Sequence, residues 1–168
     1  MKDYLNTVMD IVRHESPRLL KQYLVQNPNW TLREKGFNNY TPVMEAVSLE
    51  RLEMVVTICD YVKSSTDNSA FVSYLNESSS DGKNTILIAT CMNHQTEVLE
   101  YLISNGANYS KKDNTNKGVK DYSVLSASEL IEKFWANFDP KKYEQIIKHN
   151  VDLNTVRKRS GGNRGMMI

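Results

Sequence analysis

The sequence has little of what marks secreted, membrane-spanning or nucleic-acid-binding proteins. Its 168 residues include only two cysteines, Cys59 and Cys91, too few for a disulfide framework, and both lie in apolar stretches typical of core thiols in a reducing compartment. No apolar run approaches the roughly 20 residues that span a bilayer. A net charge of +1 provides no overall field toward nucleic acid, membranes or acidic substrates. Composition therefore favours none of these classes.

The first residues also lack the pattern of an export signal, because no charged segment leads into an apolar one. Apolar residues make up 40% and charged residues 24% of the chain, which is ordinary for a folded protein. The length allows one compact domain or a short solenoid. We therefore expect a soluble, intracellular, monomeric protein without membrane contacts.

The clearest motif is a two-helix unit at residues 81–110. Thr85 is of a type that caps a helix, and a short apolar helix follows it. After a turn at 93–95, a second helix carries one apolar stripe, and Gly106 stops it by adopting the left-handed conformation of a C-cap. The stripe consists of Val98, Leu99, Leu102 and Ile103. Neither helix buries its stripe alone, so the unit needs stacked neighbours.

The same spacing recurs along the chain. Thr41-Pro42 opens a helix as a cap followed by proline in the first turn, and Ala46 and Val47 fill the small-residue positions taken by Thr90 and Cys91. Upstream, Asn6 stands in the capping position. Downstream, Ser123 and Leu125 open a fourth unit. The remaining stripes are Met54, Val55, Ile58 and Cys59 in the second unit, Val8, Ile11, Val12, Leu19, Leu20, Tyr23 and Leu24 in the first, and Ile146 and Ile147 in the fourth.

These units resemble ankyrin repeats, whose pattern runs roughly D-x-x-G-x-T-P-L-H-x-A-A, a turn, then V-V-x-x-L-L-x-x-G-A-D-V-N. The resemblance implies an all-α solenoid of stacked helix-turn-helix units joined by hairpin-like loops. It covers residues 3–154 within a domain at 1–154, with repeats at 3–37, 38–80, 81–119 and 120–154. Residues 155–168 are basic and contain glycine, and we expect a flexible tail there.

Two segments depart from the repeat pattern. Residues 63–80 form a polar insert, which we interpret as a loop with room for an extra short helix. The fourth unit is longer than the others around Trp135 and Phe138, as terminal repeats often are. These two aromatic residues are candidates either for a binding patch or, preferably, for covering the end of the core.

No catalytic, cofactor or metal site is predicted. The three histidines, His14, His94 and His149, lie at no metal-ligand spacing. Cys91 and His94 are helical neighbours, but we expect a buried and inert thiol at Cys91. We therefore predict a protein that is not an enzyme. One alternative is an enzyme or modifier whose site is built on residues 63–80, and another is nucleic-acid association through Arg157, Lys158, Arg159 and Arg164.

The resemblance implies that a partner protein binds to the concave side of the first helices and to the hairpin tips. Exposed apolar residues at such positions are typical of binding hot spots. Richness in Asn, Lys and Ser adds the hypothesis of a host-directed effector or regulator. The candidate partner-binding residues are Phe37, Asn39, Glu45, Ser48, Leu49, Lys83, Met92, Asn93, Lys111, Lys112 and Asp113.

Overall fold

The computed structural model describes residues 2–28 and 32–149, and within this part of the chain the secondary structure is helical, without strands. The all-α prediction is thus confirmed. The helices are α1 (Lys2–His14), α2 (Pro17–Gln26), α3 (Pro42–Ser48), α4 (Leu52–Ser65), α5 (Asn68–Leu75), α6 (Thr85–Met92), α7 (Glu97–Ser104), α8 (Val119–Leu125) and α9 (Glu129–Ala136), with a short 3-10 turn at Phe37–Asn39. Residues 140–149 are also helical.

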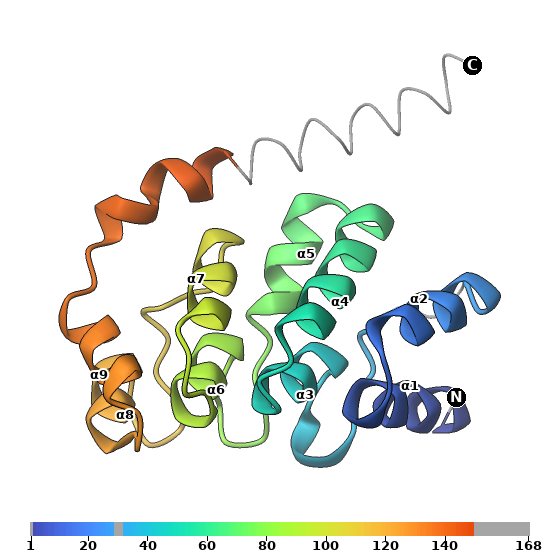
Figure 1. Cartoon of the computed structure of the whole chain (residues 1–168), viewed down its shortest axis with the longest axis horizontal. Helices are drawn as coiled ribbons and strands as arrows, with labels where there is room; N and C mark the ends of the chain where they lie inside the picture. Colours follow the sequence, from blue (N-terminus) through green and yellow to red (C-terminus); the bar gives the residue numbers. More distant parts are fainter. Residues whose placement is uncertain (1, 29–31, 150–168) are drawn as a thin grey trace.

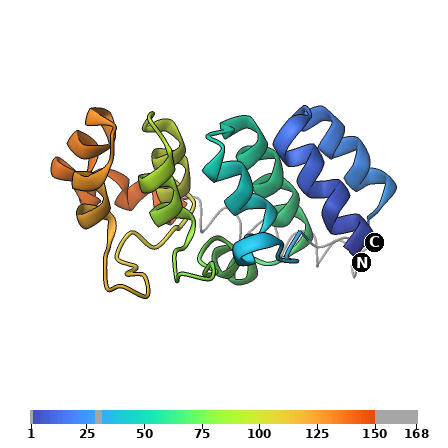
Figure 2. The ribbon, with the colours of Figure 1, turned by 90° about the horizontal axis from the view of Figure 1, so that it is seen from below.

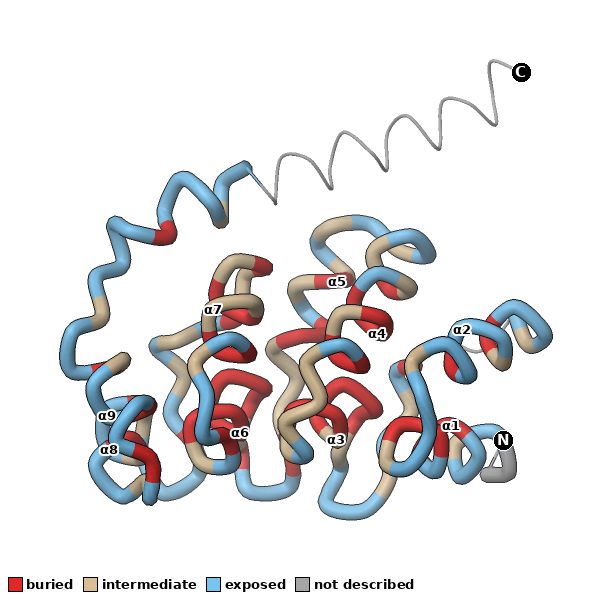
Figure 3. Tube along the Cα trace, viewed as in Figure 1, coloured by how far each residue is buried: buried red, intermediate tan, exposed pale blue. Residues whose placement is uncertain are grey.

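The helices form stacked antiparallel pairs in two layers (Figures 1 and 2). The first helices of the pairs, α1, α3, α6 and α8, contact one another in sequence and are called the inner helices here. Their partners are α2, α4, α7 and α9. The buried core lies between the layers, as the red segments of Figure 3 show. Each pair therefore buries its apolar stripe against its neighbours, as a repeat stack requires.

Side-chain caps explain where most of these helices begin. Thr41 caps α3 as predicted, its hydroxyl accepting a hydrogen bond from Met44 N at 3.4 Å. In the third unit the predicted cap is wrong by one residue: Asn84 accepts from Leu87 N at 3.2 Å, while the Thr85 hydroxyl donates to the Leu75 carbonyl at 2.9 Å. Asn84 therefore matches Thr41 in register.

Two further predicted starts are also wrong. Asn6 lies inside α1, which begins at Lys2, and Ser123 lies inside α8, which begins at Val119 after Gly118. Gly118 has no side chain to act as a cap. Instead, its backbone N–H donates back to the carboxylate of Asp121 at 2.8 Å. Because this cap comes from within the helix, a search for a capping residue before the helix misses it.

Three five-residue hairpin turns precede α3, α6 and α8. Each is closed by an N–H to carbonyl bond: Gly36 to Tyr40 at 2.8 Å, Ser79 to Lys83 at 2.9 Å and Asp113 to Lys117 at 3.0 Å. The fourth residue of each turn has positive φ, namely Asn39, Gly82 and Asn116. Successive turns are joined by bonds from Ser80 N to Asn38 O and from Asn114 N to Asp81 O. The turns thus fix the register of the second, third and fourth units.

The insert contributes to the core. Helix α4 continues to Ser65, and α5 follows it with Asp67 as its cap. Within α5, Phe71, Tyr74 and Leu75 are fully buried. The structure therefore contains the extra short helix, and its apolar face packs inward instead of forming a polar loop.

The fourth unit is completed by α9, and not by the segment around Ile146 and Ile147. Ile131 and Trp135 of α9 are buried, and the Trp135 indole donates to the Thr90 hydroxyl at 3.0 Å. Phe138 packs against Trp135, with the ring centroids 5.0 Å apart. Trp135 thus covers the core end. The expected ending at 150–154 and the tail at 155–168 lie outside the described residues.

Candidate functional site

Exposed apolar side chains end three successive inner helices. Leu49 follows the last residue of α3 and is 45% exposed, and Met92 ends α6 and is 51% exposed. Aligning the caps Thr41 and Asn84 places these two side chains at the same position of their repeats. Leu125 ends α8 and is 68% exposed. These three residues, Leu49, Met92 and Leu125, are called the inner row below.

Polar residues accompany the inner row on α1 and α3. Arg13 Nε lies 2.8 Å from Glu45 Oε1, an ion pair that joins the first and second units. Ser48 is half-buried and its hydroxyl donates to the Glu45 carbonyl at 2.8 Å. Glu45 and Ser48 therefore remain accessible, although each already has an intramolecular bond.

The first hairpin tip presents an aromatic ring to solvent. Phe37 is 83% exposed, the largest exposed fraction among the large apolar side chains in the described part of the chain. Asn39, in the same turn, is exposed and adopts a φ of 58°. Phe37 is thus available to a partner, whereas Asn39 shapes the turn that presents it.

Asn93 cannot belong to the surface predicted from the sequence. Its side chain is buried, and the amide donates to the Val47 carbonyl at 2.9 Å. Nearby, the carboxylate of Glu50 accepts the backbone N–H groups of His94 and Gln95 at 2.7 and 2.9 Å. Asn93 and Glu50 therefore join the second repeat to the third at the inter-helix turn.

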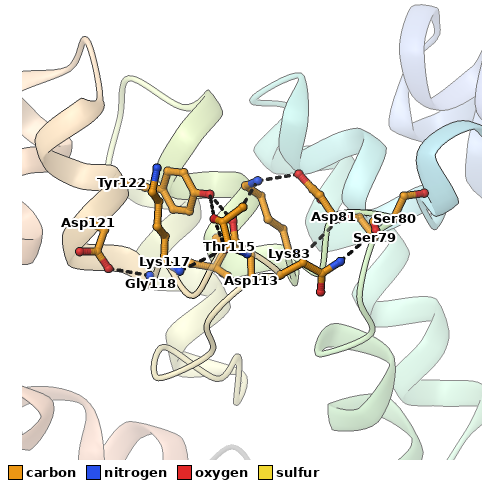
Figure 4. A network of polar contacts seen from close by, with 12 residues as sticks. Ser79, Ser80, Asp81, Lys83, Asp113, Thr115, Lys117, Gly118, Asp121 and Tyr122 are labelled. Carbon is orange, nitrogen blue, oxygen red and sulfur yellow. Dashed lines mark hydrogen bonds and ion pairs between the residues drawn. The ribbon is translucent and has the colours of Figure 1, made fainter.

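Asp113 and Lys83 lie in a polar network between the second and third hairpins (Figure 4). Lys83 Nζ lies 2.5 Å from Asp81 and 3.3 Å from Asp113, whose side chain is 1% exposed. Asp113 also accepts the hydroxyl of Tyr122 and, at 2.7 Å, that of Thr115. Both predicted residues are thus committed to the fold, and neither is a free contact for a partner.

The electrostatics of this network favour its charged form. Burial alone would raise the pKa of Asp113, but the hydrogen bonds from Thr115, Tyr122 and the Lys117 backbone outweigh it and hold the pKa well below its usual range. Two effects also act against each other at Lys83. Burial lowers its pKa, but the hydrogen bonds to Asp81, Tyr122 and Asp113 outweigh burial and raise the pKa above its ordinary value. The ammonium also lies 4.9 Å from the centre of the Tyr122 ring.

Lys111 and Lys112 precede the third hairpin. Lys111 is half-buried and Lys112 is exposed. Both border a cavity between the segments that end α7 and α9 and the start of α8. The structure therefore places these two lysines apart from the inner row.

The described residues hold no activated thiol or metal-binding cluster. Burial raises the pKa of Cys59 to about 12 and also raises that of Cys91, so both thiols are protonated at neutral pH. Within residues 2–28 and 32–149, no group of three or more His, Cys, Asp or Glu side chains is placed to hold a metal ion. No helix in these ranges is long and apolar enough to cross a membrane.

Known proteins share both the sequence pattern and the fold of this chain. Residues 8–113 match a family model described as ankyrin repeats in three copies. The chain belongs to the ankyrin-repeat family. The resemblance drawn from the sequence motifs is thereby confirmed. Members of this family typically act as non-enzymatic modules for protein–protein interaction.

A solved structure has the same fold over most of its length. It is a chain in the crystal structure of the yeast ribosomal protein Rps3 in complex with its chaperone Yar1, with a TM-score of 0.72 and 16% identity. The alignment covers 86% of this chain and 95% of that chain. At this identity the likeness concerns the fold alone. No curated protein matches the sequence.

Sequence reasoning missed Leu125, the third member of the inner row. The sequence pattern predicts that the fourth unit starts at Ser123, which places Leu125 near the beginning of a helix, whereas Leu125 ends α8. The alignment of the third hairpin with the second gives the correct start of α8. Asp113–Lys117 aligns with Ser79–Lys83, with Asn116 at the position of Gly82, and this alignment starts α8 immediately after Gly118.

Proposed function

We propose that this ankyrin-repeat chain binds a partner protein through the inner row and the first hairpin tip. The observation that carries the proposal is the recurrence of exposed apolar side chains, Leu49, Met92 and Leu125, at the ends of three successive inner helices. Large apolar side chains exposed on successive repeats are costly to leave in water and typical of surfaces that bind other proteins. Phe37, in the hairpin before α3, adds an exposed aromatic ring at the other end of that helix.

The polar surroundings fit this reading. Glu45, paired with Arg13, and Ser48 lie beside the apolar residues and suit the rim of an interface. The related fold in the Rps3–Yar1 complex supports a binding role as an analogy, since that structure is a complex of a protein with its chaperone. The proposed partner is another protein. We propose that the repeat stack binds it as a monomer inside the cell. The further hypothesis of a host-directed effector or regulator rests on composition alone.

The test is affinity capture with wild-type protein and with the triple variant Phe37→Ala, Leu49→Ala, Met92→Ala. We expect a specific partner to be retained by the wild type and bound at least about tenfold more weakly by the variant, because the three substitutions remove much of the apolar area that the partner would bury. Circular dichroism checks that helicity is unchanged.

The matched control is Ile146→Ala, which removes a side chain 45% exposed, as Leu49 is, from the helix at 140–149. This control should leave binding intact. Equal retention by the triple variant and the wild type would move the binding surface elsewhere on the stack.

A further inference from the structure

The third repeat contains a network of three asparagines that closes the gap between its hairpin and its second helix. Asn84, the cap of α6, donates to Asn76 Oδ1 at 3.1 Å and to the Asn108 carbonyl at 3.2 Å. Asn76 donates in turn to the Gly106 carbonyl at 3.1 Å and accepts from Asn108 N at 2.7 Å. Together these amides tie the loop before α6 to the loop after α7.

The fourth repeat has none of these three asparagines. Aligning hairpin 79–83 with 113–117 and α7 with α9 places Ser110, Gly118 and Pro140 at the positions of Asn76, Asn84 and Asn108. Gly118 has no side chain to donate, and Pro140 has no backbone N–H. The network therefore cannot form in the fourth repeat.

A cavity of about 500 Å³ opens at this place, and Ser110, Gly118 and Pro140 all line it. Its volume lies within the range of ligand sites, roughly 300–1,000 Å³. Tyr109, Phe138 and Trp135 supply aromatic walls, and the rings of Tyr109 and Phe138 meet edge to face at 4.9 Å. The cavity can thus receive an apolar or aromatic side chain.

Lysines surround this aromatic cavity. Lys111 and Lys112 come from the loop after α7, and Lys120 comes from α8. Lys112 and Lys120 are exposed and Lys111 is half-buried, so their ammonium groups can meet charges outside the cavity. The acidic member of the lining, Asp121, is engaged in accepting the Gly118 N–H at 2.8 Å. The rim is therefore net positive.

We propose that this cavity binds an acidic segment of a partner protein, with an apolar or aromatic side chain against Tyr109 and Phe138 and flanking carboxylates on Lys111, Lys112 and Lys120. A peptide fits better than a small anion, because the charged groups stand at the rim while the walls are aromatic. The cavity lies at the start of α8, the opposite end from Leu125. It is therefore a second binding surface, independent of the inner row.

The test uses full-length protein and a fluorescently labelled peptide with one phenylalanine flanked by aspartates and glutamates. Trp30→Phe leaves Trp135, which lines the cavity, as the chain's one remaining tryptophan. We expect saturable binding by anisotropy together with a change in Trp135 fluorescence. Peptides with glycine in place of phenylalanine, or with lysines in place of the acids, should bind at least about tenfold more weakly.

Two sets of variants locate the binding. A Cβ at Gly118 would meet Lys111 O at 3.5 Å, an ordinary contact, so Gly118→Phe can fill the cavity without a backbone clash and should abolish binding. Replacing Lys111, Lys112 and Lys120 with Gln should weaken binding about tenfold. The matched control replaces Lys141, Lys142 and Lys148, exposed lysines of the helix at 140–149, with Gln and should leave binding within about threefold of wild type. Thermal unfolding checks that every variant is folded.

Several outcomes would overturn the proposal. Equal affinity for the acidic and basic peptides, or for the phenylalanine and glycine peptides, would remove the chemistry on which it depends. Equal losses in the two lysine triples would indicate a general charge effect. Binding of ATP that Gly118→Phe abolishes, without binding of the acidic peptide, would assign the cavity to a small anion instead. The Phe37, Leu49, Met92 variant should still bind the acidic peptide, because its substitutions lie outside the cavity. The two proposed surfaces can therefore fail or succeed separately.

Discussion

The third and fourth repeats share one backbone framework and fill it differently. Both have a hairpin closed by the same N–H to carbonyl bond, a left-handed fourth residue and an eight-residue second helix. In the third repeat, Asn76, Asn84 and Asn108 close the space behind the hairpin, whereas in the fourth it remains open beside aromatic rings. The hairpins thus set the register of a repeat, while a few side chains decide whether the space behind the hairpin is filled or open.

The largest effect is expected at Trp135, because the fourth repeat depends on it for covering the core end. Trp135→Ala removes a side chain that is 1% exposed and should lower the free energy of unfolding by about 3–5 kcal/mol. Urea denaturation measures this change. Trp135→Phe, which keeps an aromatic ring and loses the bond to Thr90, should cost clearly less. Equal losses in both variants would show that the hydrogen bond, and not packing, holds the fourth repeat.

The Asp113 network should show the next largest effect. Asp113→Ala leaves Lys83, Thr115 and Tyr122 without their shared acceptor and should cost about 2–3 kcal/mol in unfolding free energy at neutral pH. Ser79→Ala at the equivalent position of the third hairpin should cost less, because Ser79 is uncharged. Denaturation of the two variants side by side provides the comparison, and a larger loss at Ser79 would reverse it.

The pH dependence of stability follows from the sign of the Asp113 shift. Its folded-state pKa lies below the unfolded value of about 3.9, so its stabilising contribution is complete above that value and is lost as pH falls toward the folded pKa. Wild-type protein should therefore lose more stability than Asp113→Ala between about pH 5 and pH 2. Thermal unfolding across this range is the measurement. Parallel pH profiles for the two proteins would show that Asp113 is not the titrating group.

An inner helix within the stack can also be compared with α8 at its end. Val47 and Val124 take the same position of their inner helices, but Val47 is fully buried and Val124 is 68% exposed. Val47→Ala should cost about 2 kcal/mol, whereas Val124→Ala should change the unfolding free energy by less than about 0.5 kcal/mol. Chemical denaturation distinguishes the two. A large loss for Val124→Ala would mean that another part of the chain covers this end.

The smallest effect concerns the asparagine network itself. Asn84→Gly, which gives the third repeat the residue of the fourth, should cost at least about 1 kcal/mol, because it removes three side-chain hydrogen bonds, the cap of α6 included. The reciprocal change Gly118→Asn supplies a side-chain cap to α8 and should stabilise by a few tenths of a kcal/mol. Thermal unfolding of both variants checks the signs. A stabilising Asn84→Gly would mean that the network contributes nothing to the fold.

The sequence predicts the repeat framework well because its signals are local. Thr41-Pro42 starts α3 and Gly106, with a φ of 100°, follows α7, and both positions depend only on neighbouring residues. The apolar stripes of α4 and α7 likewise follow from helical periodicity. The family, the all-α class and the pairing of helices could therefore be predicted.

The site could be predicted only where exposure follows from repeat position. Phe37, Leu49 and Met92 are exposed as expected. Asn93 is buried because its amide reaches Val47 on the preceding repeat, a contact between residues distant in sequence. Asp113 is likewise buried by Lys83 and Tyr122 from two different units. Such contacts depend on how the repeats stack, and single-sequence patterns do not encode them.

The central claim, that the inner row binds a partner protein, is tested most directly by site-specific photo-crosslinking. A photoreactive phenylalanine analogue is placed at Leu49 in one protein and at Ile146 in another, two positions each 45% exposed. Each protein is irradiated in an extract of the cells in which it acts. If the inner row binds a partner, one discrete adduct forms at position 49, is absent at position 146 and is lost when Phe37→Ala and Met92→Ala are added. The absence of an adduct at position 49, or the same adduct at both positions, would contradict it.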